Sequence, residues 1–171
     1  MPRRYLLSTI ILIILVTSVL AVLGSSMITI VSAGKLSGVK VIKGPSPIKN
    51  AESASEEDIT LMNEYLAVTF GIGTSPPWGV PNGYIIDAAP VVNGVPGMDV
   101  LAQFSFIVNG WGKWAKLVDI EVVENTTSRG VIKAIGYWKD IKVEITYILE
   151  AGSKYLYIET KLTNEGTQPY K

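Results

Sequence analysis

The sequence contains no cysteine and no histidine. Without cysteine, the chain has no disulfide framework, no thiolate metal site and no thiol nucleophile. Without histidine it lacks the commonest general base and the commonest zinc ligand, so Ser-His and Cys-His catalytic arrangements are excluded. Glutamine occurs only at Gln103 and Gln168, and scarcity of thermolabile residues is typical of proteins from thermophiles.

Charge of either sign is not in excess, since 15 basic residues balance 15 acidic ones. Arg3 and Arg4 lie near the N-terminus, so the residues after Ala33 carry two more acidic than basic side chains. Nucleic-acid binding needs a basic face that neutralises phosphates, and this balance offers none. We therefore exclude nucleic acid as a partner. A length of 171 residues, 48% of them hydrophobic, fits one domain with a sizeable core plus an export signal.

The N-terminal segment 1–33 has the pattern of an export signal. A basic start is followed by the uncharged, Leu-, Ile- and Val-rich run 5–23, which is long enough to cross the roughly 30 Å hydrocarbon layer as a helix. Val31 and Ala33 supply the small residues that a signal peptidase needs, so cleavage after Ala33 is favoured over retention as a membrane anchor. A buried core helix is less favoured. Either main outcome places the rest of the chain outside the cell or at its surface.

The remainder divides into a predicted linker over 34–57 and a β domain over 58–171. The linker contains Gly44-Pro45-Ser46-Pro47 and an acidic, serine-rich stretch, with no sustained apolar period. From Ile59 onward apolar residues recur with period two, which predicts strands with one core face. Strands are expected over 66–72, 84–89, 100–108, 118–122, 131–138, 141–149 and 155–163, the last with Leu156, Ile158 and Leu162 on one face.

The strands indicate an all-β fold, an antiparallel β-sandwich. Turn residues such as Asn93-Gly94 and Lys139-Asp140 separate the runs, and the C-terminal third is predicted to form a meander with one buried and one solvated face. About eight or nine strands in two or more facing sheets account for the pattern. A further strand should begin at Thr167, so we expect the domain to be incomplete at its C-terminus.

Carboxylates are the remaining candidates for chemistry. Glycosidases need two of them across a sugar, and the acids nearest to aromatic or loop segments are Asp87, Asp99, Asp119 and Glu124. Their spacing singles out no pair, and solvated surface charge explains most acids here. The Asp-x-Asp-x-Asp spacing of a calcium loop is absent too. The sequence therefore predicts no catalytic residue, no metal site and no cofactor.

Aromatic residues near Gly-rich loops offer a binding surface. Trp78, Trp111, Trp114 and Tyr84 are the candidates for stacking on a sugar ring, and Trp138 and Tyr137 complete the aromatic set. The competing explanation, which we favour, is that the tryptophans plug the end of the sandwich. For Trp78 the prolines at 76, 77 and 81 predict a rigid loop that folds the indole back over the sheet. Asn125-Thr126-Thr127 is an N-glycosylation sequon in a predicted turn.

A family resemblance rests on four phrases of the sequence. These are EYLAVTFGIGTSPPWGVPNG at 64–83, IIDA at 85–88, LEAGS at 149–153 and LTNEG at 162–166. They resemble the N-terminal β-sandwich of exported archaeal starch-degrading enzymes, the glucodextranase-like and amylopullulanase-type proteins, whose sandwich is similar to the galactose-mutarotase supersandwich. The resemblance implies a domain that accompanies polysaccharide hydrolysis while the catalytic acids lie in a separate barrel.

Three functions remain open. The first is a non-catalytic accessory domain that binds an α-glucan at the cell surface, so the expected partner is a polysaccharide, with the membrane as a second partner if the N-terminal segment is retained. The second is a structural surface component, such as an S-layer or filament protein, that assembles through strand edges. The third, less favoured, is a hydrolase acting by itself.

Overall fold

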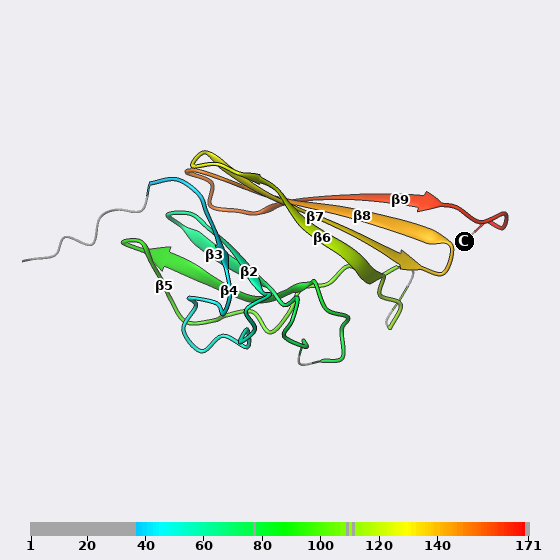
Figure 1. Cartoon of the computed structure of the whole chain (residues 1–171), viewed down its shortest axis with the longest axis horizontal. Helices are drawn as coiled ribbons and strands as arrows, with labels where there is room; N and C mark the ends of the chain where they lie inside the picture. The colour runs from blue at the N-terminus through cyan, green and yellow to red at the C-terminus, as the bar shows by residue number, and fades with distance from the viewer. Residues whose placement is uncertain (1–36, 77, 109, 111, 170–171) are drawn as a thin grey trace, which may run out of the picture. The chain divides into compact units, whose positions relative to one another are not determined.

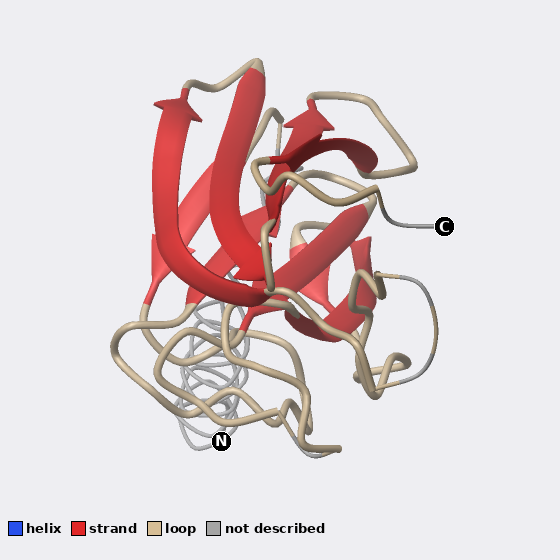
Figure 2. Ribbon diagram, turned by 90° about the vertical axis from the view of Figure 1, so that its right-hand side faces the viewer, coloured by secondary structure: helices blue, strands red, loops and turns tan. Residues whose placement is uncertain are grey.

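The computed structural model describes residues 37–76, 78–108, 110 and 112–169. In this part of the chain, nine strands form two antiparallel sheets (Figure 1), and Figure 2 shows strands and loops with no helix. The predicted class, all-β with antiparallel sheets, is confirmed. The hydrophobic N-terminal segment and the cleavage site at Ala33 lie outside the described residues. Within those residues, no helix is long and apolar enough to cross a membrane.

The first sheet has five strands, each antiparallel to its neighbour. In spatial order they are β1 (Lys40–Lys43), β2 (Ile59–Met62), β3 (Leu66–Phe70), β4 (Ile85–Val92) and β5 (Val95–Pro96). Asn93 and Gly94 connect β4 to β5 with φ angles of 51° and 78°. Two successive positive φ angles are the requirement of a type I′ turn, which Asn-Gly satisfies at low cost.

The second sheet is a meander of four strands in sequence order. They are β6 (Lys116–Asn125), β7 (Arg129–Trp138), β8 (Ile141–Glu150) and β9 (Tyr157–Asn164). In β8 the side chains of Ile141, Val143 and Ile145 are buried, whereas Lys142 and Glu144 face outward. This is the alternation that the sequence predicts.

The two sheets contribute side chains to one hydrophobic core. Leu61 and Phe70 come from the first sheet, and Ile132 and Tyr147 from the second. The rings of Phe70 and Tyr147 meet edge to face with centroids 4.8 Å apart. Aromatic pairs in this geometry stabilise a fold by roughly 0.5–1.5 kcal/mol beyond the burial of their area. The sheets are therefore packed through their inner faces.

Strand β9 departs from the predicted pattern. Ile158 is 39% exposed and Leu162 is 51% exposed, although both lie on the face that carries the core in β8. Leu156, just before the strand, packs partly against the core. Ile158 and Leu162 thus share one face as predicted, but that face is not buried, and β9 is the last strand of its sheet among the described residues.

The segment 37–57 is not the linker that its composition predicts. It contributes β1, and Val39, Ile48 and Ser53 within it are buried. Ile48 joins Met62 in a second apolar cluster on the far face of the first sheet. Hydrogen bonds, rather than a long apolar run, hold the segment in place, so the apolar periodicity of the sequence does not reveal that it belongs to the fold. The prediction of a single core face is wrong for β2, whose four residues are all buried, because Ile48 of the segment 37–57 packs against Met62 on the far face of the sheet.

The expected strand over 100–108 is replaced by an irregular segment. Its backbone meets β4 only at points, including a single bridge between Ile85 and Phe104. The carboxylate of Asp99 accepts the N–H of Ala88 at 2.8 Å, a donor that a regular ladder would use. A side chain thus replaces a strand partner at this edge of β4.

Candidate functional site

The loop between β3 and β4, residues 71–84, is closed at its base. The N–H of Gly71 donates to the carbonyl of Tyr84 at 3.1 Å, and the N–H of Gly83 donates to the carbonyl of Gly71 at 2.7 Å. Gly83 has a φ of 96°, and a Cβ there would collide with the side chain of Ile120 on β6. Glycine is therefore required at the point where the loop passes over the second sheet.

Asp58 holds the first half of the 71–84 loop. Its Oδ1 accepts the backbone N–H groups of Ile72, Gly73 and Thr74 at 2.9, 3.0 and 3.1 Å. Its Oδ2 accepts the hydroxyl groups of Thr74 at 2.6 Å and Ser53 at 2.7 Å. Burial acts to raise the pKa of Asp58, but these hydrogen bonds outweigh it and lower that pKa below its usual value. The charged carboxylate of Asp58 thus fixes the backbone of residues 72–74 by accepting their N–H groups.

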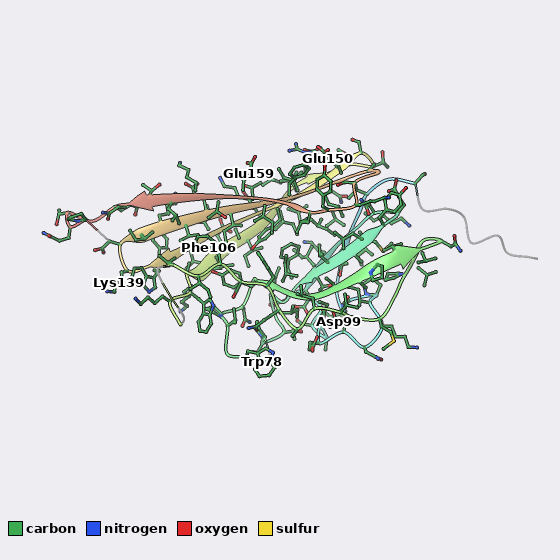
Figure 3. The ribbon with its side chains drawn as sticks, turned by 180° about the vertical axis from the view of Figure 1, so that it is seen from behind. Trp78, Asp99, Phe106, Lys139, Glu150 and Glu159 are labelled. Carbon is green, nitrogen blue, oxygen red and sulfur yellow. The ribbon has the colours of Figure 1, made fainter. Side chains whose placement is uncertain are left out.

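The anchored loop leaves Trp78 in solvent. Val80, two residues on, is inserted into the core, whereas Trp78 is 68% exposed and projects away from both sheets (Figure 3). The expectation that Trp78 plugs the sandwich is therefore wrong. The physical reason is that Val80 fills the position over the core. Gly79, between the two residues, has a left-handed φ of 70°, and the side chains of Trp78 and Val80 point in different directions.

The other predicted aromatic candidates lie elsewhere. Tyr84 is completely buried, and its hydroxyl group donates to the carbonyl of Ala115 at 3.0 Å. Burial raises the pKa of Tyr84 to about 12. Trp114 is partly buried and packs against the core. Tyr84 thus belongs to the core and presents no face to a sugar, which corrects its assignment as a binding residue. Trp111 lies outside the described residues.

Two of the four candidate acids come together in the structure. Carboxylate oxygens of Asp87, Asp99 and Glu52 all lie within 4.8 Å of one another. Asp87 is completely buried, and its oxygens accept the N–H groups of Glu52 at 2.6 Å and Ser53 at 3.4 Å. Burial, the adjacent Glu52 carboxyl group and the charge of Asp99 raise the pKa of Asp87 to about 7. These contacts attach the segment 37–57 to β4 and leave Asp87 no access to a substrate.

The remaining sequence candidates lie on β6. Asp119 is exposed, and Glu124 forms an ion pair with Arg129 at 2.9 Å. Asn125 is exposed at the end of β6, where Thr126 and Thr127 begin the turn to β7. The sequon is thus exposed, but Asn125 is the last residue of β6 and only its two threonines lie in the predicted turn.

Sequence reasoning missed the carboxylate cluster, and it did not predict that β9 is exposed on both faces. Glu52 comes from the segment 34–57, and only long-range pairing of that segment with β4 brings it to Asp87. For β9 a signal does exist, because Glu159 and Lys161 alternate with Ile158, Thr160 and Leu162, which places the two charges on one face of the strand. Comparison with protein-family models, with curated proteins and with solved structures finds no significant match.

Proposed function

We propose that the chain is an exported, non-catalytic accessory domain that binds an α-glucan at the cell surface through Trp78. The observation that carries the proposal is the exposure of this indole at the end of a loop that Asp58 holds in place. A flat aromatic face stacks on the C–H face of a sugar ring, and a loop already ordered before binding loses little entropy when the sugar docks.

The finer elements of the proposal follow from the sequence. The two sheets form a β-sandwich of the supersandwich type that the resemblance implies, with the N-terminal segment serving as a signal peptide or anchor. The domain accompanies polysaccharide degradation by catalytic acids located elsewhere. Glycosylation at Asn125 fits an extracytoplasmic location, and the sequon lies on β6 rather than on the 71–84 loop.

Affinity electrophoresis in gels containing starch, pullulan or dextrin tests the proposal. The chain from Gly34 onward should be retarded in at least one gel, and Trp78→Ala should migrate as in a gel without polysaccharide. Tyr155→Ala is the matched control, since Tyr155 is an aromatic residue that is 56% exposed outside the 71–84 loop. Unretarded migration of the parent in all three gels, or equal retardation of the parent and Trp78→Ala, would refute the proposal.

A further inference from the structure

One edge of β9 carries a regular set of backbone groups with no strand partner among the described residues. Within that part of the chain, β9 pairs with β8 alone and is the last strand in the order of its sheet (Figure 1). Just after the strand, the N–H of Glu165 donates to the carbonyl of Asp140 at 2.9 Å. Because backbone groups alternate between the two sides of a strand, those of Ile158, Thr160 and Leu162 point away from β8. An antiparallel partner can therefore bond at these three positions.

The side chains of β9 make the strand complementary to itself. Around Thr160 the sequence reads Ile158, Glu159, Thr160, Lys161, Leu162, so that an apolar residue and a charged residue flank the centre on each side, with opposite charges. When two copies pair antiparallel with Thr160 opposite Thr160, Glu159 of each copy faces Lys161 of the other. On the inner face, Ile158 of each copy faces Leu162 of the other.

Other registers lose this match. Shifting the centre by one residue in either direction places Glu159 opposite Glu159 or Lys161 opposite Lys161. Like charges directly opposite each other destabilise a strand pair, whereas opposite charges stabilise it. The register centred on Thr160 is also the one in which all three outward-pointing residues bond with their counterparts.

The ion pairs around β9 favour the binding of a second carboxylate, besides that of Glu144, to Lys161. Glu144 on β8 forms ion pairs with Lys133, Lys142 and Lys161 at 3.6, 3.8 and 3.2 Å. The hydrogen bond from Lys161 is the main reason why the pKa of Glu144 is lowered. Three ammonium groups thus share one carboxylate. Glu159, labelled in Figure 3, forms no ion pair with another described residue.

We infer that β9 pairs antiparallel with β9 of a second copy of this chain, centred on Thr160, and joins two four-stranded sheets into one of eight. The pairing covers the apolar side chains of Ile158 and Leu162, which the core leaves half exposed. Directly opposite residues of an antiparallel pair point to the same face, so these four apolar side chains gather on one side of the joined sheet. The assembly is independent of glucan binding, and it gives a specific form to assembly through strand edges.

Disulfide crosslinking tests the register. Because the natural sequence has no cysteine, an introduced cysteine can form a disulfide only with its counterpart in a second copy. In hydrogen-bonded antiparallel pairs the Cα atoms lie about 5.5 Å apart, within the range of disulfides. The full chain carrying Thr160→Cys, in detergent micelles, should form a covalent dimer under mild oxidation. Its initial rate should be at least about tenfold that of Glu121→Cys, an exposed position on β6 at the other edge of the sheet.

Charge reversal then separates self-pairing from a local structural effect. In the Thr160→Cys background, Glu159→Lys should reduce the rate to that of the Glu121→Cys control, because it places Lys161 opposite a lysine. Adding Lys161→Glu should restore the rate, although it removes the bond to Glu144. Equal rates for Thr160→Cys and the control, an unchanged rate in Glu159→Lys, or no recovery in the double variant would each overturn the inference.

Discussion

Thr74 is bonded twice to Asp58, through its hydroxyl group at 2.6 Å and through its backbone N–H at 3.1 Å. The hydroxyl oxygen of Thr74 in turn accepts the N–H groups of Ala54 and Ser55 at 2.9 and 3.1 Å. Two stretches of chain, residues 54–58 and the loop around residue 74, therefore meet in one polar cluster. This cluster fixes the first half of the 71–84 loop through hydrogen bonds rather than through apolar packing.

Replacing Asp58 should be strongly destabilising. Asp58→Ala removes the acceptor for several N–H and O–H groups, and each donor left unpaired in a buried position costs roughly 1–3 kcal/mol. We expect a loss of unfolding free energy of about 3 kcal/mol or more in urea titrations. Glu57→Ala, at the exposed neighbouring position, should stay within about 0.5 kcal/mol of the parent. A small loss for Asp58→Ala would mean that water replaces the carboxylate.

The meander of the second sheet is the part of the fold that the sequence predicts best. Alternation along β8 and the two-residue turn at Lys139-Asp140 are local features, so the sequence displays them directly. The attachment of the segment 37–57 is different. It depends on Ser46 bonding to Thr69 and on Glu52 bonding to Asp87, pairs of residues that are far apart in the sequence and carry no periodic signal.

The direction of Trp78 could not be predicted for a related reason. Proline restricts the backbone but does not decide which side of a loop faces the core. That decision rests on Asp58 holding the residues before Trp78 and on Val80 entering the core after it. The sequence therefore predicts an ordered loop bearing an aromatic residue, and the long-range contacts determine that the residue is exposed.

Asp87 should make the free energy of unfolding depend on pH between about pH 4 and pH 7. Its folded-state pKa of about 7 lies above the ordinary value of 3.8, so the folded state binds a proton that the unfolded state releases. Stability from this group is present below about pH 4 and is lost as the pH rises to 7. The melting temperature should fall between about pH 4 and pH 7 and level off above that range.

Asp87→Asn tests this assignment, because the amide resembles a protonated carboxyl group and keeps an acceptor for the N–H of Glu52. The variant should show a flatter dependence of melting temperature on pH between about 4 and 7. Asp119→Asn, at an exposed acid of β6, should keep the dependence of the parent. If Asp87→Asn and the parent have parallel profiles, the titrating group lies elsewhere.

Two glycines of the 71–84 loop should respond differently to alanine. Gly79 and Gly83 both have left-handed backbones, with φ angles of 70° and 96°. A Cβ at Gly79 meets no atom within 4 Å, whereas one at Gly83 collides with Ile120 and Leu117 of β6. Gly79→Ala carries only backbone strain, of order 1 kcal/mol, and Gly83→Ala adds a steric clash.

The difference between these two variants isolates the contact of the loop with the second sheet. We expect Gly83→Ala to lose at least about 1 kcal/mol more unfolding free energy than Gly79→Ala. Chemical denaturation at one pH measures both. Equal losses would indicate that the loop shifts at its base to accommodate the methyl group.

Trp78→Ala should leave the stability of the fold almost unchanged. Its side chain is 68% exposed, and surface substitutions usually alter the free energy of unfolding by no more than about 0.5 kcal/mol. Tyr84→Phe is the contrasting variant, because it takes the donor away from the buried carbonyl of Ala115 and should cost roughly 1–3 kcal/mol. A loss of about 3–5 kcal/mol in Trp78→Ala is what truncation of a core aromatic produces, and it would contradict the exposed position on which sugar binding depends.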